Sequence, residues 1–375
     1  MDENRPSEEI QAAREFDAKM IAERIGIRAP VEYARELDDE TEDGEEIRAE
    51  IFWLRFPANS EYGTDSTEVK LYMPENPNGE AIIFTPGYPG AESGRFEHSY
   101  AKKLIDEGYA LSVVRHNSVS LDLDGELAQN IINSPQRQQD AKEDDQHHIG
   151  PTKENGYTWD DINKGTIPVI LAFAPRFTEI HMIGHSFGAA STMISLSEIY
   201  KKEPEILEKV GNFISLAGFL GRDEEVGHDK TRHGLKMSID PLIEDGKRKS
   251  LDRGVDIAPT EDYKEGIIST TKLLEDSSIP DSIGQVLVLS PDDPNIASPV
   301  VKTNEGVINH YDYPGHTKKT LYIEDETHDD NFHMLPNLRA ETLLRLIRMK
   351  VSSKGPHYVK VQSKEPKQEN YETTD

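Results

Sequence analysis

The chain has 375 residues, of which 35% are hydrophobic and 30% are charged, and its formal net charge is −28. A chain of this length can bury a large core. An acidic surface repels phosphate backbones and anionic lipid head groups, so the charge argues against nucleic acid or a membrane as the main partner. Cysteine is absent, which excludes a disulfide framework and thiolate metal ligands.

Apolar runs in this sequence are too short for a membrane span, which needs roughly 18 consecutive residues. The opening stretch "MDENRPSEEIQAARE" is acidic and polar. A secretory signal would need a basic start and an apolar stretch. We therefore expect a cytoplasmic protein without a membrane span.

The first 46 residues are expected to form an N-terminal extension, with an amphipathic helix over residues 7–25 and an acidic stretch after it. From residue 47 onward, apolar runs with alternation or β-branched residues predict strands, and apolar residues at helical spacing predict helices. The predicted strands are 47–56, 67–74, 81–87, 109–117, 179–184, 212–218, 285–290 and 319–325. The predicted helices are 95–108, 159–174, 187–202 and 334–351. This alternation predicts an α/β fold with a mostly parallel central sheet and helices on both faces.

Two long polar segments interrupt the predicted core. Residues 118–157 form a long loop, and residues 219–280 form a cap or lid insertion that divides the core into 47–218 and 281–351. Residues 352–375 form a polar C-terminal tail. Both long segments would leave the sheet at the carboxyl ends of its strands, which is the edge where such sheets bind ligands.

A serine flanked by glycines lies between a predicted strand and a predicted helix, in the sequence "GHSFG" at residues 184–188. A serine hydroxyl is a weak nucleophile until a base takes its proton. A sharp strand-to-helix turn exposes such a serine, and flanking glycines let the neighbouring elements approach. We therefore predict that Ser186 is a catalytic nucleophile, and the alternative is a structural turn that happens to contain a serine.

A nucleophile of this kind needs hydrogen-bond donors for the oxyanion that develops on the substrate. The backbone N–H of Phe187, directly after the serine, is one candidate. The loop "TPGYPG" follows the predicted strand 81–87, and the N–H of Tyr88 in this loop is the second candidate. An ordinary Pro/Gly turn is the alternative interpretation of the loop.

Taken together, "GHSFG" and "PGYPG" resemble the nucleophile elbow and the oxyanion loop of serine hydrolases with the α/β-hydrolase fold, near esterases and serine aminopeptidases. The sequence departs from that pattern at Pro86, where the family often has histidine. The resemblance implies a triad in the order serine, acid, histidine, each after a strand. It places the acid at Asp293, with Asp292 as the alternative and Asp223 as a more distant one, and the base at His328.

The resemblance therefore implies a serine hydrolase that cleaves a carboxylic ester by acyl transfer through Ser186. A serine peptidase or amidase would use the same residues, and a catalytically inactive binding protein of the same fold is an alternative of another class. No cofactor and no metal are expected, and His147 and His148 are interpreted as part of a solvated acidic loop. The expected partner is a small-molecule substrate, and a homodimer remains open.

Overall fold

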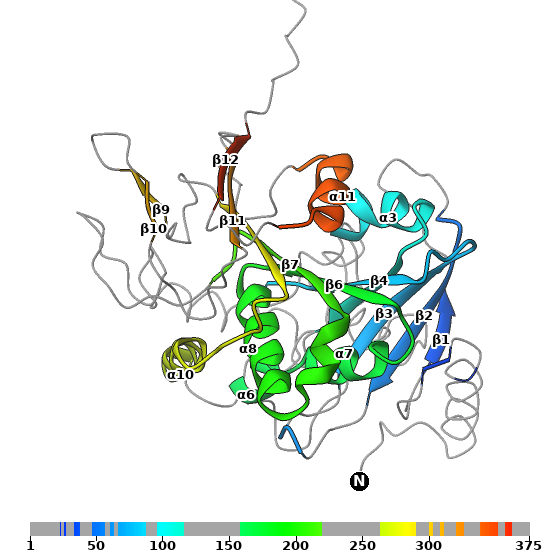
Figure 1. Ribbon diagram of the computed structural model, residues 1–375. Coiled ribbons are helices and arrows are strands. Elements are labelled where there is room, and N and C mark those ends of the chain that lie inside the picture. Colours follow the sequence, from blue (N-terminus) through cyan, green and yellow to red (C-terminus); the bar gives the residue numbers. More distant parts are fainter. Residues whose placement is uncertain are drawn as a thin grey trace, which may run out of the picture.

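The structure is a computed structural model (Figure 1), and it describes part of the chain. The described residues are 23, 26–27, 34–37, 47–56, 61–63, 67–87, 96–115, 158–219, 263–289, 300–302, 308–310, 320–325, 338–351 and 357–361. The helix predicted over 7–25 lies outside them except for Glu23, and the loop 118–157 lies outside them entirely.

A ten-stranded sheet forms the centre of the described structure. Its strands, in spatial order, are β1 (Ala34–Leu37), β2 (Ala49–Phe56), β3 (Thr67–Pro74), β5 (Ala110–Arg115), β4 (Glu80–Thr85), β6 (Glu179–His185), β7 (Val210–Leu216), β8 (Gly284–Leu289), β11 (Thr320–Asp325) and β12 (His357–Val361). The strands from β5 to β12 in this order are mutually parallel. The pairs β1–β2, β2–β3 and β3–β5 are antiparallel, so the mixed part lies at one edge. The two short strands β9 (Val300–Lys302) and β10 (Ile308–His310) pair separately.

Helices cover both faces of this sheet (Figure 1). The helical elements are η1 (Glu97–Ala101), α3 (Lys102–Asp106), α6 (Trp159–Asn163), α7 (Ile167–Phe173), α8 (Phe187–Lys202), η2 (Pro204–Lys209), α10 (Tyr263–Glu275) and α11 (Ala340–Arg348). One hydrophobic core joins the sheet to α6, α7, α8 and α10, and a second core joins the opposite face to α3 and α11. The central strands are apolar toward both cores, which is why they read as nearly continuous hydrophobic runs in the sequence.

All eight predicted strands are present, and helix α8 spans exactly the predicted residues 187–202. The helix predicted over 159–174 is instead two helices, α6 and α7, because the chain turns at residues 164–166. Pro168 lies in the first turn of α7, where its missing N–H leaves no hydrogen bond unmade. The helix predicted over 95–108 begins with the π-helical turn η1 before it continues as α3.

Short elements were not foreseen. Strands β1, β9 and β10 have three or four residues each and carry too few residues for a periodic pattern. Strand β12 lies within the stretch expected as a polar tail, and it extends the sheet by pairing with β11. In the segment expected as a cap, α10 packs against α6 and α8 of the core. The proposed division of the chain into segments remains a prediction.

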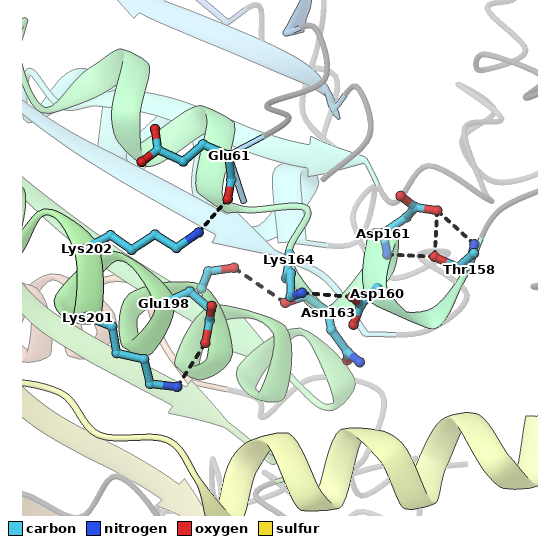
Figure 2. A network of polar contacts seen from close by, with 10 residues as sticks. Glu61, Thr158, Asp160, Asp161, Asn163, Lys164, Glu198, Lys201 and Lys202 are labelled. Atoms are coloured by element: carbon cyan, nitrogen blue, oxygen red, sulfur yellow. Dashed lines mark hydrogen bonds and ion pairs between the residues drawn. The ribbon is translucent and has the colours of Figure 1, made fainter. Parts of the chain in front are cut away.

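Polar contacts hold α6 against α8 (Figure 2). Helix α6 begins with a capping box in which Thr158 and Asp161 each satisfy the backbone N–H of the other. Ser191 of α8 donates a hydrogen bond of 2.8 Å to the carbonyl of Ile162 in α6. Ser195, one turn later, reaches the carbonyl of Asn163 at 3.4 Å. The serines of α8 therefore satisfy carbonyls at the end of α6, which ties the second and third turns of α8 to this neighbour. Within the described residues, no helix has the length and apolar character needed to cross a membrane.

Candidate active site

Ser186 occupies the turn between β6 and α8 in a conformation that residues other than glycine rarely adopt. Its φ is 50° and its ψ is −122°. Such a backbone costs about 1–3 kcal/mol and persists only when the surroundings enforce it. Here the Ser186 N–H donates to the carbonyl of Leu216 at 3.0 Å. The Ser186 carbonyl accepts from the N–H groups of Ala189 at 3.1 Å and Phe219 at 2.9 Å. Both ends of the residue are thus held in place by backbone hydrogen bonds.

The two glycines of "GHSFG" are required by close contacts, as the sequence predicts. A Cβ on Gly184 would lie 2.6 Å from the Cα of Ala189, so the end of β6 approaches the start of α8 too closely for a side chain. A Cβ on Gly188 would lie 2.1 Å from the carbonyl oxygen of Thr85 and 2.3 Å from that of Pro86. The first turn of α8 therefore rests directly on the end of β4.

The same approach brings the start of the predicted oxyanion loop to the nucleophile. A Cβ on Gly87 would lie 2.9 Å from the Cβ of Ser186 and 3.2 Å from Nδ1 of His185. Phe187, the other predicted donor, is the first residue of α8, where backbone N–H groups point out of the helix end. The structure thus brings Gly87, Ser186 and Phe187 together. Tyr88, the residue after Gly87, lies outside the described residues.

The other predicted site residues, Asp292, Asp293 and His328, also lie outside the described residues, as does Asp223. The strands before them are described, and their ends are aligned with Ser186. In the register of the sheet, His185 of β6 is opposite Leu216 of β7, which is opposite Val288 of β8. Val288 is in turn opposite Ile323 of β11. Strands β6, β8 and β11 therefore end at the same edge. The roles of Asp292, Asp293, His328 and Asp223 remain predictions.

An aromatic cluster surrounds the side chain of Phe187. The ring of Trp159 in α6 lies 5.5 Å from the Phe187 ring, centroid to centroid, and the Phe219 ring is stacked nearly parallel to the Phe187 ring at 6.1 Å. All three side chains are buried. A Cβ on Gly266 of α10 would overlap the Trp159 indole, so α10 closes over this cluster. Because its ring is buried in contact with Trp159 and Phe219, the backbone of Phe187 has a fixed orientation next to Ser186. Sequence reasoning did not identify Trp159 or Phe219, whose apolar character alone does not distinguish them from other core residues.

A second residue with a strained backbone, Ala217, lies close to the Ser186 turn. Ala217, directly after β7, has a φ of 45°. Its N–H donates to the carbonyl of Val288 at 3.0 Å. This turn directs the chain so that Phe219 can bond to the carbonyl of Ser186. Alanine carries no signal for this backbone conformation, so the sequence could not predict it.

A buried ion pair joins β3 to the start of η1. Lys70 of β3 lies 3.0 Å from Oε2 of Glu97, the first residue of η1, and the two side chains are only 4% and 1% exposed. The hydroxyl of Tyr72 donates to the same carboxylate oxygen. This network fixes the start of η1 against β3. A lysine in an alternating strand predicts a solvated side chain, and the sequence therefore gave no sign of this pair.

No protein-family model matches the chain, and no curated protein matches it in sequence. Solved structures do resemble it in shape. The 2,6-dihydroxy-pseudo-oxynicotine hydrolase is 13% identical, with 81% of this chain and 70% of that chain covered and a TM-score of 0.45. An esterase from Exiguobacterium antarcticum is 15% identical, with 61% and 80% covered and a TM-score of 0.35. A structure described under two metagenome-derived lipolytic enzymes, LipS and LipT, is 15% identical, with 74% of this chain and 96% of that chain covered and a TM-score of 0.37.

At these identities and TM-scores, the assignment of the fold rests on the topology of the chain itself. The sheet is antiparallel at one edge and parallel from β5 to β12, and β4 lies between β5 and β6. Helices cover both faces, and a strained serine follows the central strand β6 at the start of α8. The predicted fold class is therefore confirmed: this chain has the α/β-hydrolase fold.

Proposed function

We propose that this protein is a serine hydrolase that cleaves a carboxylic ester by acyl transfer through Ser186. The observation that carries the proposal is the conformation of Ser186, at a φ of 50° in the turn between β6 and α8. A protein has no structural need for a serine at a position that glycine would occupy without strain. Strain of this kind clusters at functional sites, and here it places a hydroxyl at the ligand-binding edge of a parallel sheet.

The proposed reaction follows the serine, histidine, acid scheme. His328 takes the proton of Ser186 as Oγ attacks the ester carbonyl carbon, and the backbone N–H groups of Phe187 and Tyr88 bind the resulting oxyanion. His328 then gives this proton to the leaving alcohol as the acyl–oxygen bond breaks. A water molecule attacks the acyl-enzyme in the same way and releases the acid. Asp293, or Asp292 in its place, orients the imidazole and stabilises its charged form.

The contacts around Phe187 support its part in this scheme. An oxyanion donor must be held in place before the reaction, because reorganisation during the reaction would reduce its effect. The ring of Phe187 packs against Trp159 and Phe219, and its backbone begins a helix. The fixed contact of Gly87 with Ser186 supports a second donor from the next residue of that loop.

A fluorophosphonate probe, which reacts only with an activated serine, tests the nucleophile. We expect the wild-type protein to be labelled and Ser186→Ala to show no labelling. Ser191→Ala is the matched control, because Ser191 lies in the same helix and its hydroxyl donates to the carbonyl of Ile162, away from the proposed site. Labelling of Ser186→Ala at the wild-type level would contradict the proposal.

Turnover of esters and amides tests the remaining roles. His328→Ala should lose as much ester turnover as Ser186→Ala, because the residues of a triad act as a unit. Asp293→Asn should reduce turnover more than Asp292→Asn, and the reverse would exchange their roles. A panel of esters of graded chain length beside aminoacyl amides compares the esterase proposal with a peptidase or amidase. Faster turnover of the amides would replace the proposed substrate class.

A further inference from the structure

A cluster of one histidine and two glutamates lies at the end of β6 opposite to Ser186. Glu179 and His181 are two residues apart on β6, so their side chains lie on the same face of the sheet. Glu80 of β4 is opposite Glu179 in the parallel register and shares that face. One ligand atom from each of the three residues lies within 4.8 Å of the other two. The topology of the sheet thus brings together three side chains that are potential metal ligands.

His181 is buried, and its polar atoms are only partly satisfied. Its side chain is 5% exposed, and Nε2 lies 3.2 Å from Oε2 of Glu80. Nδ1 is buried and has no hydrogen-bond partner among the described residues. The ring of Tyr109 packs against the imidazole with the centroids 6.1 Å apart. A buried polar atom without a partner costs about 1–3 kcal/mol, so Nδ1 calls for a hydrogen-bond partner such as a water molecule. A histidine that binds a metal through one ring nitrogen donates its other N–H to such a partner, which leaves Nε2, the nitrogen next to Glu80, as the ligand atom.

A glycine on the next strand provides the space for this cluster. A Cβ on Gly211 of β7 would lie 2.1 Å from Oε1 of Glu179 and 2.9 Å from Cε1 of His181. The carboxylate and the imidazole therefore lean over β7 into the volume that any other residue would fill. The cluster borders a cavity of about 750 Å³, through which a cation could reach it. Glu208 lines the same cavity.

The charge of the cluster favours a cation. Two carboxylates meet one imidazole, and among the described residues neither Glu80 nor Glu179 has a lysine or arginine in an ion pair. Arg348 lines the same cavity, but it is bound to Glu107 at 2.7 Å and to the hydroxyl of Tyr109 at 3.2 Å. Lys350 also lines the cavity. Although both basic residues line the cavity, no ion pair joins either of them to Glu80 or Glu179 among the described residues.

We propose that Glu80, Glu179 and His181 bind a divalent transition-metal cation, with Zn²⁺ as the best fit to one imidazole and two carboxylates. Zinc bonds of about 2.0–2.2 Å in a tetrahedral site place neighbouring ligand atoms about 3.4 Å apart. The distance of 3.2 Å between His181 and Glu80 meets this requirement. The exposed side chain of Glu179 can rotate to close the larger gap. The fourth position faces the cavity and takes a water molecule.

The proposed metal connects β4 and β6 at their amino ends and therefore has a structural role. His181 precedes Ser186 by five residues along the extended strand β6, so the two residues lie about 16 Å apart at a rise of about 3.3 Å per residue. A metal there cannot touch a substrate at Ser186. This site departs from the expectation, drawn from the sequence, that the protein binds no metal.

Zinc binding by the untagged full-length protein tests the proposal. Metal is removed with a chelator, and Zn²⁺ is titrated calorimetrically in citrate, which competes for weak sites on an acidic surface. The wild-type protein should bind one Zn²⁺ and its thermal midpoint should rise. Glu179→Gln should reduce the affinity at least tenfold, and Gly211→Ala should reduce it by displacing the Glu179 carboxylate. Glu205→Gln, an exposed glutamate on η2, is the matched control and should bind as the wild type does.

Equal Zn²⁺ affinity in the wild type and Glu179→Gln, or no rise in the wild-type midpoint, would overturn the proposal. Because the Glu179 side chain is exposed, Glu179→Gln leaves the packing of the core unchanged, whereas His181→Gln alters a buried residue. Co²⁺ offers a second measurement, since ligation by His181 would produce visible absorption that His181→Gln lacks. Fluorophosphonate labelling of Ser186 should be unchanged in Glu179→Gln, so this test is independent of the proposed hydrolase activity.

Discussion

Replacing Ser186 with glycine and with alanine should separate the backbone strain at this residue from the loss of its hydroxyl. Both substitutions remove Oγ, but only glycine also removes the Cβ that makes a φ of 50° unfavourable. We expect Ser186→Gly to be more stable than Ser186→Ala. At an ordinary position in a helix or strand, glycine is instead less stable than alanine by about 0.5–1 kcal/mol.

The size of the difference follows from the observed conformation. A residue other than glycine at a φ of 50° and a ψ of −122° carries a strain of about 1–3 kcal/mol. Glycine loses about 0.5–1 kcal/mol more than alanine through the entropy of the unfolded chain. The Ser186 side chain makes no capping hydrogen bond to α8, so removal of the hydroxyl costs no cap in either variant. The free energy of unfolding of Ser186→Gly should exceed that of Ser186→Ala by about 1 kcal/mol.

Urea denaturation followed by circular dichroism measures this difference, with equal slopes showing that only stability has changed. The matched control is Ser197 near the other end of α8, a buried serine within the regular helix. There, Ser197→Gly should be less stable than Ser197→Ala. If Ser186→Ala were as stable as Ser186→Gly, the hydrogen bonds around the turn would not be enforcing a strained backbone, and the reasoning would be wrong.

Two further predictions concern residues outside the turn. Lys70→Met should reduce the free energy of unfolding by about 3–5 kcal/mol in the same urea experiment, because it leaves the Glu97 carboxylate buried without its cation. Adding Glu97→Gln to this variant should recover part of the lost stability. Additive effects of the two substitutions would refute the pairing. Burial raises the pKa of both Tyr62 and Tyr109, and a hydrogen bond to Glu203 raises that of Tyr62 further. Their protonated phenols therefore stabilise the folded state fully below pH about 10, and this stabilisation is lost as the pH rises further. The thermal midpoint should fall above that pH, less steeply in Tyr62→Phe, and an identical slope in the two proteins would contradict this cause.

The sequence by itself determined the elements and the centre of the candidate site, because both depend on local patterns. Continuous apolar runs identify buried parallel strands without reference to their partners. The spacing of Gly184, Ser186 and Gly188 likewise specifies a strand-to-helix turn, since the steric need for glycine is set by immediate neighbours in the chain. The contacts of Gly184 and Gly188 in the structure agree with that interpretation.

Only the tertiary structure decided which distant residues meet. The burial of Lys70 depends on Glu97, and the backbone of Ala217 is held by a carbonyl of β8, a strand that lies about 70 residues further along the chain. The cluster of Glu80, Glu179 and His181 arises from the register between β4 and β6, which no local pattern encodes. Residues far apart in sequence become neighbours only when strands pair, so the chemistry that depends on such neighbours becomes visible only in the folded chain.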